Sequence, residues 1–191
     1  MMKRDQCLKL LAKYHRDELV VPVYQATFEW LAIKPDAPTF TAVGAMGQAS
    51  SLALGLALGL PQRRVIVLDG DGSLLMNLGS LVTIANAAPG NLLHFVCENG
   101  TYEANGGHPI PGKDRLSFAG LARAAGYREA YEFAALDALE AALPGILRAT
   151  GPVFIDLKVE PGASYPQDWA YMHGSAAREK FRAAVRQSQS T

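Results

Sequence analysis

Two acidic residues stand between glycines where an apolar run ends. Asp69 and Asp71 belong to the sequence Asp-Gly-Asp-Gly-Ser, which follows "RRVIVL" and precedes "LLMNL". Glycines allow a sharp turn and a close approach of the main chain to a ligand, and the N–H groups that open the next helix suit a phosphate. A carboxylate beside a phosphate requires a divalent cation between them, as Mg²⁺ provides. Asp71 is therefore a candidate cation ligand, with helix capping as the alternative.

A second set of oxygen ligands follows at the end of the next apolar run. "NLLHFVC" leads into Glu98-Asn99-Gly100-Thr101, and Asn99 lies 28 residues after Asp71. One helix and one strand fill this interval, so we expect both side chains at neighbouring strand ends. An amide oxygen and a turn carbonyl are further ligands that suit a hard cation.

A sheet whose strands end at one edge must position these residues. Short apolar runs alternate with helical patterns along the chain. Strands are expected at 19–24, 40–43, 63–70, 91–99, 127–133 and 151–161. Helices are expected within 1–18, at 26–33, within 44–60, and at 74–88, 117–126, 136–150 and 175–187. The alternation predicts an α/β fold: three layers, doubly wound, with a mainly parallel six-stranded sheet and helices on both faces. Ligands bind beyond the carboxyl ends of such strands.

The composition is that of one neutral domain. Lys plus Arg and Asp plus Glu both number 18, so no charge imbalance favours nucleic acid or an anionic membrane. Cys7 and Cys97 give no disulfide framework and too few thiols for an iron–sulfur cluster. No targeting or membrane-spanning segment is evident. We expect a cytoplasmic protein with a single domain over 1–191, an N-terminal helix in 1–18 and a C-terminal helix and tail in 173–191.

The spacing of Asp71 and Asn99 resembles the signature of thiamine-diphosphate enzymes. In that family this stretch binds the diphosphate of the cofactor through Mg²⁺. The resemblance implies that Asp71, Asn99 and the carbonyl of Thr101 hold Mg²⁺, while Gly72 and Ser73 present N–H groups to the diphosphate. Glu98 departs from the Asn that family members often carry at this position.

An upstream loop adds to the resemblance. "VGAMGQAS" (43–50) is similar to the family's Gly-x-apolar-Gly loop. The resemblance implies that Met46 wedges between the two cofactor rings and bends the cofactor, and that the carbonyl of Gly44 accepts a hydrogen bond from its pyrimidine amine. Core packing is the alternative for Met46. The implied cofactor-binding residues are Gly44, Ala45, Met46, Gly70, Asp71, Gly72, Ser73, Asn99, Thr101 and Tyr102.

Half of the family's active site has no counterpart in this chain. Thiamine-diphosphate enzymes need a second domain that grips the pyrimidine and supplies an activating Glu, and nothing around Glu18 or Glu29 resembles its setting. We therefore expect a separate, alpha-type pyrimidine-binding subunit. "GAMGQASSLALGLALG" and "NGTYEANGGHP" are similar to segments of the sulfopyruvate and phosphonopyruvate decarboxylase family. The resemblance implies non-oxidative decarboxylation of a small 2-oxo acid by a hetero-oligomer, with a homodimer as an option for the isolated chain.

Two other functions compete with the decarboxylase. One is a non-catalytic thiamine-diphosphate-binding module, and the other is the beta subunit of a 2-oxoacid oxidoreductase, which normally carries cluster cysteines. His108 is a candidate for proton transfer or for binding an anionic substrate, with an exposed loop His as the alternative. Lys113 and Arg115 are candidates for a sulfonate or phosphonate group, with solvated charges as the alternative.

Overall fold

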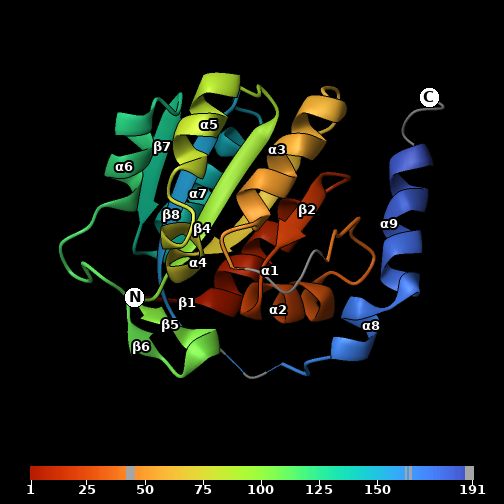
Figure 1. The fold of residues 1–191 in the computed structure, drawn as a ribbon, viewed down its shortest axis with the longest axis horizontal. Coiled ribbons are helices and arrows are strands. Elements are labelled where there is room, and N and C mark those ends of the chain that lie inside the picture. The colour runs from red at the N-terminus through yellow and green to blue at the C-terminus, as the bar shows by residue number, and fades with distance from the viewer. Residues whose placement is uncertain (42–45, 162, 164, 188–191) are drawn as a thin grey trace.

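Six parallel strands form the central sheet of the computed structural model, which describes residues 1–41, 46–161, 163 and 165–187 (Figure 1). The strand order is β2-β3-β4-β8, and β7 and β1 pair with successive parts of β8. The strands are β1 (Met2–Lys3), β2 (Leu19–Pro22), β3 (Val65–Gly70), β4 (Leu92–Glu98), β7 (Glu129–Phe133) and β8 (Val153–Glu160). The predicted parallel sheet of six strands is confirmed.

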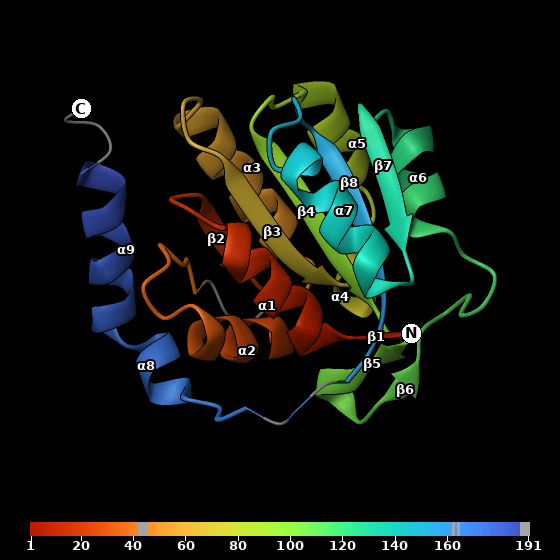
Figure 2. The same cartoon turned by 180° about the vertical axis from the view of Figure 1, so that it is seen from behind.

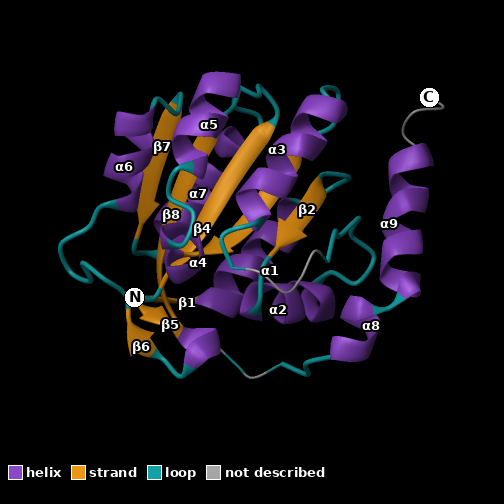
Figure 3. Ribbon diagram, viewed as in Figure 1, coloured by secondary structure: helices purple, strands orange, loops and turns teal. Residues whose placement is uncertain are grey.

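Helices cover both faces of the sheet, as predicted (Figures 2 and 3). Those on one face are α1 (Arg4–Tyr14), α2 (Gln25–Ile33) and α7 (Leu136–Ile146). Those on the other face are α3 (Ala49–Gly59), α4 (Asp71–Leu75), α5 (Ser80–Ala87) and α6 (Phe118–Ala125). The central strands are therefore buried on both sides, which explains their near-continuous apolar sequence.

The two apolar cores follow from the alternation of side chains along β3 and β4. Ile66 and Phe95 pack on the face that α1, α2 and α7 cover. Val67 and Val96 point the other way, toward α3, α5 and α6. Successive residues of a strand face opposite sides of the sheet, so one apolar run supplies both cores.

The predicted strand at 40–43 is wrong for Phe40 and Thr41, while residues 42–43 lie outside the described part of the chain. The segment before it does run beside β2, where Thr39 forms an isolated bridge to Val20. The N–H of Phe40 donates to Val20, but the next bond of a parallel ladder would need an N–H from Pro22 of β2, which has none, so the ladder does not continue into the predicted strand.

The predicted helix at 74–88 is two helices. A turn at 76–79 separates α4 from α5. Asn77 Nδ2 in this turn donates to the carbonyl oxygen of Gly47 at 2.8 Å. The Asn77 side chain thus stabilises the turn between α4 and α5. The pattern of apolar residues at 74–88 does not show such a turn.

The C-terminal segment leaves β8 and crosses the carboxyl-end edge of the sheet (Figure 1). It contains α8 (Trp169–His173), which the sequence analysis did not predict, and α9 (Ser175–Gln187), which it did. Phe181 of α9 packs against Phe40 with ring centroids 5.1 Å apart. No helix among the described residues is long and apolar enough to cross a membrane. The predicted cytoplasmic location stays a prediction.

Candidate functional site

Asp71 lies at the point where the carboxyl ends of β3 and β4 meet. Its Oδ2 accepts hydrogen bonds from the main-chain N–H groups of Asn99 at 3.0 Å and Gly100 at 2.6 Å, and its Oδ1 accepts from that of Gly72 at 2.7 Å. The residue is 2% exposed. Burial raises the pKa of Asp71 to about 6, against the opposing effect of these N–H groups. The predicted convergence of Asp71 and Asn99 at adjacent strand ends is therefore present.

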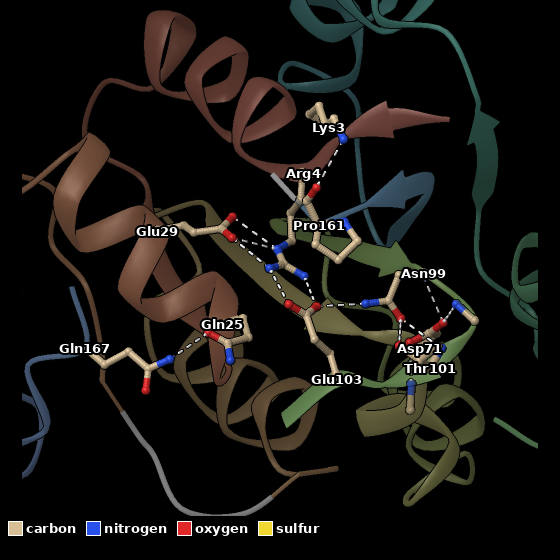
Figure 4. Close-up of polar contacts among 12 residues, drawn as sticks. Lys3, Arg4, Gln25, Glu29, Asp71, Asn99, Thr101, Glu103, Pro161 and Gln167 are labelled. Carbon is tan, nitrogen blue, oxygen red and sulfur yellow. Dashed lines mark hydrogen bonds and ion pairs between the residues drawn. The ribbon is translucent and has the colours of Figure 1, made fainter. Parts of the chain in front are cut away.

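The side-chain amide of Asn99 has a fixed orientation. Its Oδ1 accepts from the N–H of Thr101 at 2.8 Å and from Thr101 Oγ1 at 3.0 Å, while its Nδ2 donates to Glu103 Oε2 at 2.8 Å (Figure 4). Thr101 belongs to the short strand β5 (Thr101–Tyr102), and Glu103 opens the 3₁₀ turn η1 (Glu103–Asn105). The amide oxygen therefore faces the side of Asp71 and Thr101.

A buried ion cluster adjoins Asn99. Arg4 donates to Glu29 at 2.7–3.1 Å and to Glu103 at 2.5 and 3.2 Å (Figure 4). Burial alone would lower the pKa of Arg4, but its hydrogen bonds to Glu103 and Glu29 outweigh this and raise it above the ordinary value. Burial raises the pKa of Glu29, against the effect of Arg4. The sequence analysis did not place Arg4, Glu29 or Glu103 in the site, because a sequence does not show that an N-terminal Arg is buried between two distant carboxylates.

A cleft opens beside these residues and encloses roughly 460 Å³, part of it open to solvent. Predicted site residues that line it are Met46, Gly70, Asp71, Gly72, Ser73, Asn99, Thr101 and Tyr102. Tyr24 and Gln25, where the chain passes from β2 into α2, also line the cleft and were not predicted. Tyr24 has a φ of 46°, which is rare for a bulky residue and common at ligand sites. The remaining two predicted residues, Gly44 and Ala45, lie outside the described residues.

The Met46 loop is tied to the Asp71 turn. The N–H of Gly47 donates to Ser73 Oγ at 2.9 Å, and Met46 itself is half-buried at the cleft. The N–H of Gly72 is directed to Asp71 Oδ1 in this structure. The predicted roles of Met46, Gly72 and Ser73 toward a cofactor stay predictions.

Glu98, the departure from the family pattern, takes part in a second ion cluster. Lys158 Nζ lies 2.5 Å from Glu98 Oε2, 3.0 Å from Asp156 Oδ2 and 3.3 Å from Glu132 Oε2. Asp156 is fully buried in β8, and burial together with Glu98 raises its pKa to about 7, against the effect of Lys158. Glu98 therefore neutralises Lys158 on the sheet rather than pointing into the cleft.

Asp69 caps the turn after β3 and has a buried partner. Its Oδ1 accepts from the N–H of Gly70 at 2.9 Å, and its Oδ2 lies 3.4 Å from His94 Nε2. His94 Nδ1 is 3.1 Å from the hydroxyl of Tyr127. Asp69 thus connects the cleft wall to the interior of the sheet.

The predicted substrate-contacting residues lie outside the cleft lining. His108 is exposed in β6 (His108–Pro109), where it pairs with Tyr102 of β5. Lys113 and Arg115 are also exposed, and the aliphatic part of Lys113 runs beside Gly100. The structure places them on the loops around the site and outside the cleft lining, so their roles stay predictions.

The residues present fit a hard divalent cation. Among the described residues, the groups that donate hydrogen bonds to Asp71 are main-chain N–H groups, and no Lys or Arg side chain donates to it. No three His, Cys, Asp or Glu side chains of the described chain are grouped to hold a metal. Asp71, Asn99 Oδ1 and the carbonyl of Thr101, the cation ligands that the resemblance implies, are an all-oxygen set of the kind that Mg²⁺ uses, and their role as ligands stays a prediction.

Comparison with protein families gives a match over residues 23–157 to the C-terminal TPP binding domain of thiamine pyrophosphate enzymes. The chain belongs to this family. The predicted family and its cofactor, thiamine diphosphate (thiamine pyrophosphate), are thereby confirmed. Both Asp71 and Asn99 fall inside the matched range, whereas Arg4 lies before it.

Individual relatives agree with the family. The chain is 38% identical over 163 residues to sulfopyruvate decarboxylase subunit beta of Methanothermobacter thermautotrophicus, covering 85% of this chain and 84% of the relative. It is 45% identical over 124 residues to phosphonopyruvate decarboxylase of Streptomyces hygroscopicus, covering 65% of this chain but only 30% of that protein. Among solved structures, a protein of Mycobacterium smegmatis proposed to be a thiamin diphosphate-dependent enzyme superposes with a TM-score of 0.68 at 26% identity, over 84% of this chain and 32% of that one.

Gly72 is a glycine because the ring of Tyr102 lies against it. A Cβ added at Gly72 would lie 2.5 Å from Tyr102 Cδ1, whereas one added at Gly79 would meet nothing within 4 Å. We expect Gly72→Ala to lower the free energy of unfolding by about 1–3 kcal/mol through overpacking, and Gly79→Ala to change it little. Chemical denaturation measures both. The double variant Gly72→Ala/Tyr102→Ala should recover part of the loss, and equal stability of the two single variants would contradict the prediction.

The ion cluster of β8 predicts a pH dependence of stability. The carboxyl of Asp156 loses its proton near pH 3.8 when unfolded and near pH 7 when folded, so the folded state binds more protons between these values. The contribution of Asp156 to the free energy of unfolding is therefore largest at low pH, where the carboxyl is protonated, and is lost as the pH rises toward 7. We expect Asp156→Asn to remove this slope from Tm against pH, and Asp137→Asn, at an exposed carboxylate, to keep it. An unchanged slope in Asp156→Asn would refute the assignment.

Proposed function

We propose that this chain is the diphosphate- and Mg²⁺-binding subunit of a thiamine-diphosphate-dependent, non-oxidative 2-oxo-acid decarboxylase. The observation that carries the proposal is the buried carboxylate of Asp71 at the carboxyl ends of β3 and β4, beside the oxygen end of Asn99. This observation stands in a chain that spans 84% of a sulfopyruvate decarboxylase subunit beta.

The charges around the cleft support a bound cation. The carboxylates of Asp69, Asp71 and Glu103 line the cleft, and so does the guanidinium of Arg4. When all three carboxylates are ionised, these four side chains carry a net charge of minus two. A divalent cation would balance that charge and would make the site attractive to a diphosphate.

Each part of the chain has a distinct role in this proposal. Asp71, Asn99 Oδ1 and the Thr101 carbonyl would hold Mg²⁺, and the Gly70–Ser73 turn would lie against the diphosphate. Met46, whose loop is tied to the same turn through Gly47 and Ser73, would support the bent cofactor. Bound thiamine diphosphate supplies an electron sink for the electron pair released when a 2-oxo acid loses CO₂. The protein's task is to orient the cofactor and to exclude water from it.

A separate subunit would complete the site. Glu29 is held by Arg4 and so is not available as the activating Glu of the family. We infer that an alpha-type, pyrimidine-binding subunit supplies this Glu and that the active protein is a hetero-oligomer. The names of the relatives favour a substrate such as sulfopyruvate or phosphonopyruvate, with a small anionic group beyond the 2-oxo acid. His108, Lys113 and Arg115 are candidates to meet that group if their loops close over the cleft.

Loss of the Asp71 carboxylate tests the cofactor site. We expect Asp71→Asn, which removes the charge and replaces one of the two acceptor oxygens by an NH2 group, to weaken Mg²⁺-dependent binding of thiamine diphosphate by more than about 100-fold. Isothermal titration calorimetry measures the affinity, and circular dichroism checks that the variant is folded. Asp69→Asn, two residues away on the same cleft wall, is the control and should bind normally. Unchanged affinity in Asp71→Asn would contradict the cation site.

Turnover tests the reaction. The chain mixed with a pyrimidine-domain partner should release CO₂ from sulfopyruvate or phosphonopyruvate, and we expect little activity without the partner. Met46→Ala should keep cofactor binding but lower kcat by about 10-fold or more, because the bent cofactor is held less tightly. Cofactor binding with no turnover across a panel of short 2-oxo acids would favour the non-catalytic module instead.

A further inference from the structure

The N-terminal helix lies before the family match, which covers residues 23–157, and still contributes a side chain to the cleft. Arg4, in the first turn of α1, lies in the cleft lining and is 5% exposed. The short strand β1 before it pairs with the end of β8, through Met2 with Val159 and Lys3 with Glu160. This pairing fixes the start of α1 beside the carboxyl ends of the strands, so that the Arg4 guanidinium reaches the cleft.

Arg4 joins two carboxylates that come from different elements. Its Nε and Nη2 donate to Glu29 of α2, and its Nη1 and Nη2 donate to Glu103 of η1. A guanidinium has five N–H donors in a planar fork, so it can hold both carboxylates at once, which an ammonium group cannot do with the same geometry. Glu29 thereby anchors Arg4, and Arg4 fixes the position of Glu103.

Glu103, held in place by Arg4, in turn fixes the orientation of the Asn99 amide. The same Oε2 that accepts from Arg4 also accepts from Asn99 Nδ2 at 2.8 Å. An ionised carboxylate only accepts hydrogen bonds, so the amide must turn its nitrogen toward Glu103. The oxygen end then faces Thr101, whose N–H and hydroxyl groups donate to it. The amide is held at both ends, and its nitrogen end is held through Arg4.

We propose that Arg4 and Glu103 are positioning residues, which hold the amide of Asn99 with its oxygen toward the cation site. This inference rests on the proposed function, since it concerns the cation ligand named there. Neither residue needs to contact the cation. Partners that orient a metal ligand typically change metal affinity by 10–100-fold when they are removed.

The experiment measures binding of thiamine diphosphate in the presence of Mn²⁺, by calorimetry and by the loss of the free-Mn²⁺ electron paramagnetic resonance signal, on the full chain. We expect Glu103→Ala to weaken Mn²⁺-dependent binding by about 10–100-fold. The variant should fold, because Arg4 remains paired with buried Glu29. Glu140→Ala removes a carboxylate that pairs with Lys13 in the last turn of α1, at the other end of the helix from Arg4, and is the control, with unchanged binding expected.

Two further variants separate positioning from charge. Glu103→Gln can still present its one oxygen to both Arg4 Nη1 and Asn99 Nδ2 and loses only the longer hydrogen bond from Arg4 Nη2. It should therefore keep most of the wild-type affinity although its charge is lost. Arg4→Lys keeps the charge but loses the fork, and should weaken binding toward the value for Glu103→Ala. An equal loss in Glu103→Gln and Glu103→Ala would assign the effect to charge and overturn the proposal.

Asp71→Asn, measured in parallel, distinguishes the two levels of the hypothesis. Loss of binding in Asp71→Asn with wild-type binding in Glu103→Ala and Arg4→Lys would overturn the positioning role and leave the cation site standing. Normal Mn²⁺-dependent binding in Asp71→Asn, or none in the wild-type chain, would overturn the cation site and the positioning role together.

Discussion

The hydrogen bonds that main-chain N–H groups donate to Asp71 hold this site together. They join the turn after β3 to the turn after β4, so one carboxylate determines how two adjacent strand ends face each other. A carboxylate buried in this way is costly unless every oxygen has a partner. Here the partners are backbone groups, whose positions do not depend on side-chain rotamers, and the resulting geometry is rigid.

The rest of the cleft is built outward from that point. Ser73 accepts from Gly47 and so brings the Met46 loop to the same turn. Asn77 binds the carbonyl of Gly47 and holds the loop from its other side. On the opposite wall Arg4 forms ion pairs with Glu29 of α2 and Glu103 of η1, two elements that are distant in sequence. The cleft is thus defined by polar contacts between loops, while the apolar cores on the two sheet faces supply the stable frame beneath them.

The sequence was sufficient to predict five of the six strands of the sheet, all but β1, and the meeting of Asp71 and Asn99 at adjacent strand ends. The apolar run before Asp69 and the run before Glu98 are each buried on both faces, and such runs identify parallel strands without tertiary information. The 28-residue spacing from Asp71 to Asn99 then follows from one crossover between neighbouring strands. The break at Asn77 and the irregular edge at Thr39 were missed because single side-chain and proline effects decide them. Arg4 was missed for a different reason: its burial depends on where β1 pairs, and two residues of strand carry no periodic signal. Gly44 and Ala45 stay predictions.

The pairing of β1 with the end of β8 also fixes where the chain enters the domain. Met1 emerges at the carboxyl-end edge of the sheet, close to the cleft, whereas residues 175–187 stand at the far side, beyond β2 (Figure 1). The two ends are therefore not equivalent as attachment points. A polypeptide joined through the N-terminus would therefore begin at the rim of the cleft, while one joined after α9 would begin at a remote surface. Fusions and affinity tags on this scaffold consequently belong at the C-terminal end if the cleft is to stay open.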